Sequence, residues 1–260
     1  MIFLKLGGSL ITAKDQPETP RLSVLQRIAD EIVSARNERG SLQLLIGHGS
    51  GSFGHTAAAR HGFEKGVMAG DDWTGFSEVW GAARRLHNLV LDSLRAADLP
   101  AISIPPSASG IAEHGELTEM SAEPVRLLME AGLIPVVYGD VVLDMNSGAS
   151  IVSTEAVFAH LARALTPDRM LLAGSEAGVY ADYPAREELL TELTPGQLSE
   201  FHLEGSEATD VTGGMEDKVR RLLNLIEELP ELEAWIFSGL KPGSIHAALT
   251  GSPGGTRLTV

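Results

Sequence analysis

The chain has 260 residues, of which 43% are hydrophobic and 21% are charged, a composition typical of a globular protein that can bury a large core. Its net charge of −15 argues against nucleic acid or an anionic membrane as the main partner, because both are themselves negatively charged. The absence of cysteine excludes disulfides, thiolate nucleophiles and cysteine-ligated zinc.

The first part of the sequence alternates strand and helix patterns. Residues 2–6 are mostly apolar and predict a buried strand that ends at the Gly7–Gly8 pair. These glycines also interrupt the apolar N-terminus, so we expect no signal peptide. No apolar run approaches the roughly 18 residues that a membrane helix needs, so we expect a cytoplasmic protein. Apolar residues at helical spacing predict a helix over 21–36, and 42–46 is the next predicted strand.

This strand–helix–strand order predicts a parallel sheet, and the alternation continues to the end of the chain. The further predicted helices cover residues 73–97, 122–131, 154–165, 214–228 and 244–249, with a weak helix near 195–201. The further predicted strands cover residues 101–104, 133–138, 169–172 and 234–237, a hairpin over 139–151 and a final edge strand over 257–260. Loops are expected over residues 11–20, 62–72 and most of 182–213. Because no linker or repeat interrupts the pattern, we expect one three-layer domain over residues 1–260.

A glycine- and serine-rich stretch, G-H-G-S-G-S-F-G-H at residues 47–55, follows the second predicted strand. Glycine lets the backbone approach a ligand closely and adopt positive φ. Successive N–H groups in such a turn form a concavity that binds anions. We interpret the stretch as a phosphate-binding loop, and a tight strand-to-helix turn without a ligand is the alternative. His48 is expected to pack or to orient this loop.

Lysines are scarce in this acidic chain and gather at turns. Of only five lysines, Lys5, Lys14 and Lys218 lie in or beside glycine or serine turns. Lys218 lies one turn inside a predicted helix that begins near Gly213 and Gly214, where free N–H groups and the helix dipole favour a phosphate. The sequence therefore predicts a phosphate site, although it contains no Walker A, protein-kinase or nucleophile-elbow motif.

Four motifs, in this order, resemble the amino-acid kinase superfamily and, within it, the isopentenyl phosphate kinase family. They are K-L-G-G-S at 5–9, the stretch at 47–55, P-V-V-Y-G-D-V-V-L-D at 135–144 and D-V-T-G-G-M-x-x-K at 210–218. The resemblance covers nearly the whole chain and implies an open αβα sandwich around a mainly parallel sheet, as a homodimer. It also implies transfer of the γ-phosphoryl group of ATP, with Mg²⁺, to isopentenyl phosphate in isoprenoid biosynthesis.

The resemblance implies an acceptor lobe over about residues 1–165 and a nucleotide lobe over about 166–260. It implies four catalytic residues: Lys5 and Lys218 at the ATP phosphates, Lys14 at the γ-phosphate, and His55 as hydrogen-bond donor to the acceptor phosphate. Because that phosphate is already an anion, no strong base is needed. The implied nucleotide-binding residues are Lys5, Gly7, Gly8, Ser9, Gly51, Ser175, Gly178, Tyr180, Gly214 and Lys218. The implied acceptor-binding residues are Ser50, Gly51, His55, Gly139, Ser153 and Thr154. No protein ligand is assigned to the metal.

The alkyl tail of such an acceptor needs a dry pocket. The predicted long helix offers an apolar stripe for it, and the alternative is that this stripe belongs to the core. The stripe consists of Phe76, Val79, Trp80 and Ala83.

The sequence departs from the family pattern at two places. The family usually has Gly-Asp where residues 153–155 read S-T-E, and T-D-V-D-G-V-Y where residues 174–180 read G-S-E-A-G-V-Y. Either Glu155 and Glu176 compensate for the two lost acidic positions, or the handling of nucleotide and metal has changed. Other functions therefore stay open: a fosfomycin-type or other small alkyl-phosphate kinase, and a non-catalytic nucleotide-binding protein on the same fold. A polar, tight acceptor pocket would favour the phosphonate kinase.

Overall fold

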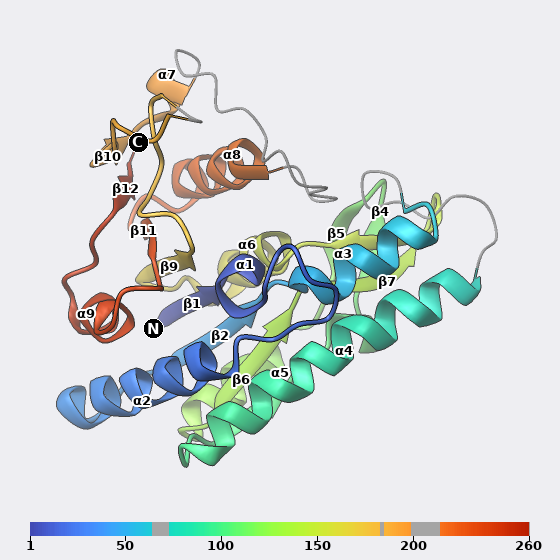
Figure 1. The fold of residues 1–260 in the computed structure, drawn as a ribbon, viewed down its shortest axis with the longest axis horizontal. Helices are drawn as coiled ribbons and strands as arrows, with labels where there is room; N and C mark the ends of the chain where they lie inside the picture. Colours follow the sequence, from blue (N-terminus) through green and yellow to red (C-terminus); the bar gives the residue numbers. More distant parts are fainter. Residues whose placement is uncertain (64–72, 183–184, 199–213, 260) are drawn as a thin grey trace.

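The structure is a computed structural model and describes residues 1–63, 73–182, 185–198 and 214–259. Its centre is an eight-stranded sheet in the order β10-β12-β11-β9-β1-β2-β6-β3 (Figure 1). All neighbouring strands are parallel except β11 and β12, so the predicted mainly parallel sheet is confirmed. The strands are β1 (Ile2–Leu6), β2 (Leu44–His48), β3 (Ala101–Ser103), β6 (Ile134–Tyr138), β9 (Arg169–Gly174), β10 (Glu192–Leu193), β11 (Glu233–Ser238) and β12 (Thr256–Leu258).

The central strand β1 is buried on both faces, which explains its continuous apolar run. Ile2, Leu4 and Leu6 point into one hydrophobic core, whereas Phe3 points into the other. Since successive side chains of a strand point to opposite faces, this alternation divides the molecule into three layers. The strand thus carries Lys5 into the middle of the fold.

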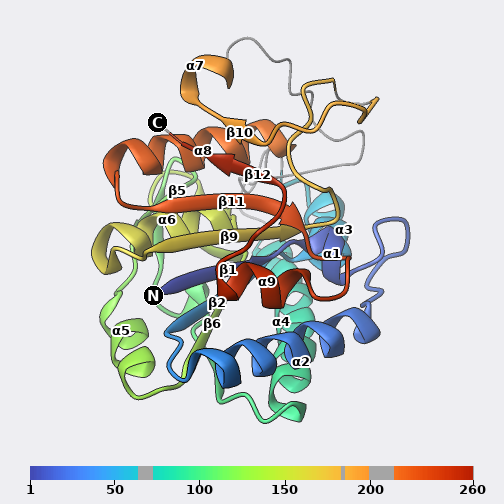
Figure 2. The ribbon, with the colours of Figure 1, turned by 90° about the vertical axis from the view of Figure 1, so that its left-hand side faces the viewer.

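Helices cover both faces of the sheet, as Figures 1 and 2 show from two directions. One layer is formed by α2 (Leu22–Arg39), α4 (Trp73–Ala96) and α9 (Ser244–Thr250). The opposite layer is formed by α5 (Glu123–Glu130), α6 (Thr154–Leu165) and α8 (Gly214–Glu228). The predicted αβα sandwich is therefore confirmed. None of the helices among the residues described above is long and apolar enough to cross a membrane.

A second sheet has four strands, in the order β5-β4-β7-β8. Its predicted hairpin is confirmed as β7 (Asp140–Asp144) and β8 (Gly148–Val152). The other hairpin was not predicted, because its strands are short, polar and largely exposed. It consists of β4 (Ile111–Glu113) and β5 (Glu116–Glu119), and it follows a 3-10 turn, η1 (Pro106–Ala108).

Other boundaries differ from the prediction. The glycine-rich stretch is a loop only at Gly49 and Ser50, because β2 ends at His48 and α3 (Gly51–Arg60) begins inside the stretch. A short helix, α1 (Gly8–Ile11), follows β1 directly. The C-terminal strand β12 lies between β10 and β11, so the predicted edge strand is wrong. The weak predicted helix is α7 (Pro195–Leu198), and parts of two predicted loops, 64–72 and 199–213, lie outside the described residues.

Candidate active site

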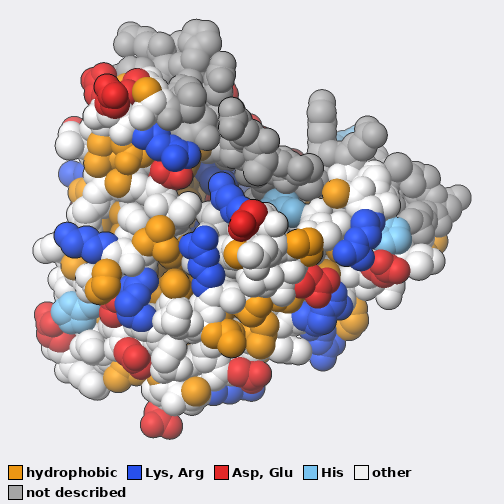
Figure 3. All heavy atoms as spheres, viewed as in Figure 1, with side chains coloured by type: hydrophobic (Ala, Val, Ile, Leu, Met, Phe, Trp, Pro, Cys, Tyr) orange, Lys and Arg blue, Asp and Glu red, His pale blue; other side chains and the backbone are white. Residues whose placement is uncertain are grey.

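A cleft of about 660 Å³ lies at the carboxyl ends of β1, β2, β6 and β9, the edge where parallel sheets bind ligands. Figure 3 shows basic, acidic and His side chains close together on this face. Gly214 begins α8, and residues 210–213 of the same motif lie outside the described residues. The cleft is lined by nearly all residues of the predicted phosphate sites: Lys5, Gly7, Gly8, Ser9, Lys14, Ser50, Gly51, His55, Gly139, Ser153, Thr154, Ser175, Gly178, Tyr180 and Lys218.

Two glycine turns touch each other in the floor of the cleft. A Cβ atom on Gly8 would lie 2.7 Å from the Cα atom of Gly51, and one on Gly51 would lie 2.4 Å from Oγ1 of Thr12. Gly51 also has a φ of +51°, which favours glycine. The N–H groups of Gly8, Ser9, Ser50 and Gly51 donate no hydrogen bond within the described part of the chain. Backbone donors from two strand ends are thus available to anionic ligands.

This close approach gives the first prediction. Gly8→Ala should lower kcat/KM at least about a hundredfold, because its methyl group meets backbone atoms that carry the second turn and displaces them. Gly254→Ala is the matched control, since Gly254 also lies in a loop, has no positive φ and has no atom within 4 Å of the position that a methyl group would occupy. Steady-state kinetics and thermal unfolding of both variants check the prediction. Near-normal turnover of Gly8→Ala would mean that the two turns need not touch.

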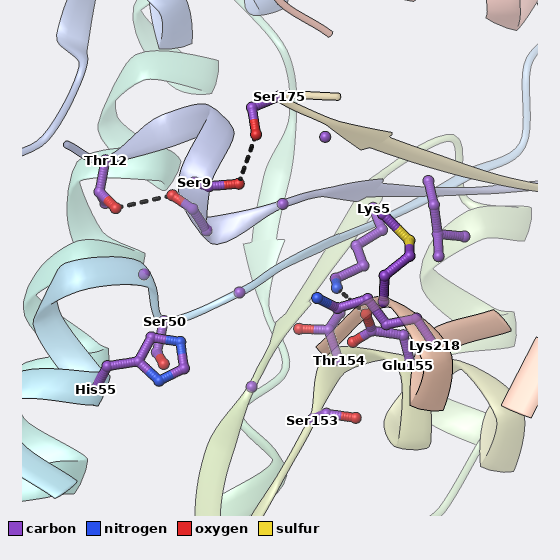
Figure 4. Close-up of a pocket in the computed structure, with 18 of the residues that line it drawn as sticks. Lys5, Ser9, Thr12, Ser50, His55, Ser153, Thr154, Glu155, Ser175 and Lys218 are labelled. Atoms are coloured by element: carbon purple, nitrogen blue, oxygen red, sulfur yellow. Dashed lines mark hydrogen bonds and ion pairs between the residues drawn. The ribbon is translucent and has the colours of Figure 1, made fainter. Parts of the chain in front are cut away.

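A buried carboxylate joins two of the predicted catalytic lysines (Figure 4). Nζ of Lys5 on β1 forms an ion pair with Oε1 of Glu155 in the first turn of α6, and both side chains are less than a tenth exposed. Burial alone would raise the pKa of Glu155, but the charges of Lys5 and Lys218 outweigh it, so this pKa lies below its usual value. Glu155 is therefore ionised, and two lysines share one carboxylate. The excess positive charge suits a polyphosphate.

Sequence reasoning noted Glu155 only as a departure from the family pattern. The structure shows it to be the partner of Lys5, at the position where α6 begins behind its N-cap Ser153. Oγ of Ser153 accepts a hydrogen bond from the backbone N–H of Ala156 at 3.1 Å, which fixes the start of the helix. The sequence contained one signal for this role, an acidic residue in the first turn of the predicted helix over 154–165.

At one end of the cleft, His55 on α3 lies opposite the lysine pair (Figure 4). A small cavity adjoins it, lined mainly by the apolar side chains of Ala58, Val79, Ala83, Val141 and Ile151. Phe76 and Trp80 are not among the residues that line either cavity, within the described part of the chain. Both are half-buried against the core, and Nε1 of Trp80 donates a hydrogen bond to Oγ of Ser107 at 3.2 Å. Of the four residues predicted to line a pocket for the alkyl tail, Val79 and Ala83 line the cavity, whereas Phe76 and Trp80 pack against the core.

At the other end, the segment after β9 lies against the first glycine turn. The hydroxyl groups of Ser9 and Ser175 are 3.2 Å apart, and the N–H of Gly7 donates to the carbonyl of Ala173 at 2.8 Å. Glu176 lies 3.4 Å from Arg186, and Gly178 and Tyr180 complete this wall of the cleft. Four polar residues that line the cleft gave no signal in the sequence, because none belongs to a recognised motif: Thr12, Thr56, Arg60 and Arg186.

No group of three or more His, Asp or Glu side chains that could bind a metal occurs within residues 1–63, 73–182, 185–198 and 214–259. Glu155 is committed to Lys5, and Glu176 lies near Arg186. Carboxylate ligands for a divalent ion are therefore few in the cleft, and phosphate oxygens are the remaining kind of ligand that Mg²⁺ uses in such sites.

Comparison with known proteins gives one consistent result. The Amino acid kinase family matches residues 1–238 of the chain. The isopentenyl phosphate kinase of Methanothermobacter thermautotrophicus is 38% identical over 272 aligned residues, which cover 100% of this chain and 99% of that protein. The isopentenyl phosphate kinase of Methanocaldococcus jannaschii is 31% identical, covering 99% and 98%. A solved isopentenyl phosphate kinase structure superposes with a TM-score of 0.84 at 33% identity and covers 100% of both chains.

Proposed function

The chain belongs to the amino acid kinase family, and from that premise we propose that it transfers the γ-phosphoryl group of ATP to isopentenyl phosphate. The product, isopentenyl diphosphate, would enter isoprenoid biosynthesis. One observation carries the proposal: a single cleft contains paired lysines, two glycine turns with available N–H groups and, beside His55, an apolar cavity. The full-length similarity to isopentenyl phosphate kinases supports the same reaction.

In this reaction an oxygen of the acceptor phosphate bonds to the γ-phosphorus, and the bond from that phosphorus to the β–γ bridging oxygen breaks. ADP leaves with the electron pair of the broken bond. The acceptor oxygen is already anionic, so no proton needs to be removed. The work of the protein is positioning and charge neutralisation. Lys5 and Lys218 would neutralise the charge on the transferring group, and Lys14, which lines the same cleft, would contact the γ-phosphate.

We assign the acceptor phosphate to His55, Ser50 and Gly51, with Gly139, Ser153 and Thr154 on the opposite wall. The tail of the acceptor would lie against the apolar side chains around the small cavity next to His55, which has a volume of about 10 Å³ and must widen to admit it. A largely apolar lining suits an alkyl group better than the compact polar phosphonate of a fosfomycin-type substrate.

We assign the nucleotide to the other end, at Gly7, Gly8 and Ser9 together with Ser175, Gly178 and Tyr180. Gly214 and Lys218 at the start of α8 complete this assignment. It divides the single domain of residues 1–260 into an acceptor lobe, about 1–165, and a nucleotide lobe, about 166–260. Mg²⁺ would bind to phosphate oxygens of the nucleotide and offset part of their negative charge, and the lysines would neutralise more of it.

A panel of acceptors tests the function. The purified protein is incubated with ATP and Mg²⁺ and, separately, isopentenyl phosphate, dimethylallyl phosphate, fosfomycin or N-acetylglutamate, and ADP release is measured. We expect the highest kcat/KM with isopentenyl phosphate. Preference for fosfomycin would establish the phosphonate kinase instead, and ATP binding without turnover of any acceptor would establish the non-catalytic alternative.

A second prediction concerns the cavity that we assign to the alkyl tail of the acceptor. Val79→Ala should raise kcat/KM for geranyl phosphate relative to isopentenyl phosphate by about tenfold, because it enlarges the cavity by two methyl groups. Trp80→Phe is the matched control on the same helix, since Trp80 is not among the residues that line the cavity. An unchanged ratio in Val79→Ala would place the tail elsewhere.

We also propose a homodimer and a cytoplasmic location. The family resemblance supports the dimer, and the use of ATP supports a compartment with a nucleotide pool. Light scattering of the purified protein tests the first, and cell fractionation tests the second.

A further inference from the structure

A line of three hydrogen bonds runs from β3 to the glycine turn through two buried histidines. Oγ of Ser103 lies 2.7 Å from Nε2 of His87, and Nδ1 of His87 lies 2.9 Å from Nε2 of His48. Nδ1 of His48 in turn lies 3.1 Å from the carbonyl oxygen of Gly49. His48 and His87 are 0% and 2% exposed, so water does not compete for these bonds.

The chemistry of these groups determines which atom donates and which accepts in each of the three hydrogen bonds. The Gly49 carbonyl can only accept, so Nδ1 of His48 carries a proton. Burial lowers the pKa of His48 to about 4 and that of His87 to about 2, so both rings are neutral near pH 7 and each carries one proton. Nε2 of His48 is then an acceptor, Nδ1 of His87 is its donor, and the Ser103 hydroxyl donates to Nε2 of His87. Both histidines are therefore the Nδ1–H tautomer.

The orientation of both rings is also fixed by packing. His48 ends β2 beside Tyr138, its partner in β6, and His87 approaches from α4. The ring of Tyr138 stacks on His87 with 4.2 Å between centroids and on His48 with 5.5 Å. Rotation of either imidazole would break this stack and a hydrogen bond together.

His48 holds three residues of the cleft wall. Its ring binds the Gly49 carbonyl, and its own carbonyl accepts hydrogen bonds from the N–H of Gly139 at 3.0 Å and from Oγ1 of Thr154 at 2.7 Å. In a trans peptide the C=O and N–H groups point in opposite directions. Fixing the Gly49 carbonyl toward His48 therefore turns the N–H of Ser50 away from the core, toward the cleft.

We propose that His48 and His87 are positioning residues that, with Ser103, fix the Gly49–Ser50 peptide for the acceptor phosphate. They do not touch the substrate and act through the backbone of the glycine turn. The role in catalysis rests on the proposed function, because it assumes that this turn binds the acceptor. The direction of the hydrogen bonds and their effect on anion binding do not depend on it.

Kinetics of His87 variants test the positioning role. His87→Leu removes the donor to His48 and should raise KM for isopentenyl phosphate about tenfold while KM for ATP stays unchanged, a loss of the size of one buried hydrogen bond. His87→Asn keeps a side-chain N–H group near the Nδ1 position and should recover most of the affinity. Val90→Ala, which creates a cavity in the core one turn further along α4, is the matched control for packing loss. Equal increases of both KM values, or no recovery with asparagine, would overturn the proposal.

A spectroscopic measurement keeps the inference testable if a variant does not fold. Long-range ¹H–¹⁵N correlation spectra of the free wild-type protein should show both imidazoles protonated at Nδ1, and a proton on Nε2 of either ring would overturn the proposal. Titration with inorganic phosphate should show weaker binding to His87→Leu than to wild type. If isopentenyl phosphate is not a substrate while both results hold, the proposed function fails and the positioning inference stands.

Discussion

Lys5→Met should reduce kcat by about a thousandfold, the largest effect that we expect from a single substitution in this protein. Methionine preserves the length of the side chain but not its charge, so the transferring phosphoryl group loses a cation that a buried carboxylate holds in place. The variant should also lose about 3 kcal/mol of unfolding free energy, because Glu155 is left buried with Lys218 as its remaining cation. Steady-state kinetics and urea denaturation measure the two effects.

A second substitution separates catalysis from stability. In Lys5→Met/Glu155→Gln the buried charge is removed, so much of the unfolding free energy should return, while kcat should stay low. Recovery of activity in the double variant would mean that Lys5 serves only to neutralise Glu155. Glu155→Gln alone should fold and retain Lys5, but with less exact placement of its ammonium group.

His55→Ala should lower turnover about a hundredfold and leave ATP affinity near normal. The reason is that His55 lies in the cleft on α3, across from the lysine pair, and on the proposed assignment it donates to the acceptor phosphate and does not contact the nucleotide. Turnover with saturating ATP and direct nucleotide binding are the measurements. A parallel loss of ATP affinity would contradict the division of the cleft into two ends.

His55→Gln is the matched variant, because the glutamine amide can donate a hydrogen bond but cannot become positively charged. We expect it to recover part of the lost turnover. If glutamine performs no better than alanine, the positive charge of a protonated imidazole is required, and the hydrogen bond alone is insufficient.

The fold was largely predictable because its strongest signals are local. The continuous apolar run of β1 and the amphipathic pattern of α8 depend on side chains close together in sequence, and the predicted bounds of both elements agree with the structure. The position of β12 could not be predicted in this way. Which strand lies at an edge depends on pairing with β10, a strand of only two residues that gives no pattern of its own.

The start of α3 was mistaken for loop because glycine disfavours helices. Tertiary contacts override this preference: the N–H of Ser52 donates to Oγ1 of Thr12 at 3.1 Å, and α3 packs along α4. For the site, motif residues were found because glycine, lysine and histidine stand out in turns. His87 gave no such signal, since it lies on the buried face of a long helix and its partners are 39 and 16 residues away.

The turn after β1 contacts both ends of the cleft, through Gly8 and Gly51 on one side and through Ser9 and Ser175 on the other. On the proposed assignment of the cleft, the length of this turn sets the distance between the two phosphates that react. Changing the length of this turn would alter the reaction distance for every acceptor at once. Substitutions in α3, α4 and the hairpin β7–β8 would reshape the end of the cleft that contains His55 and leave the turn after β1 unchanged. We therefore expect new acceptors to arise by substitutions in these elements.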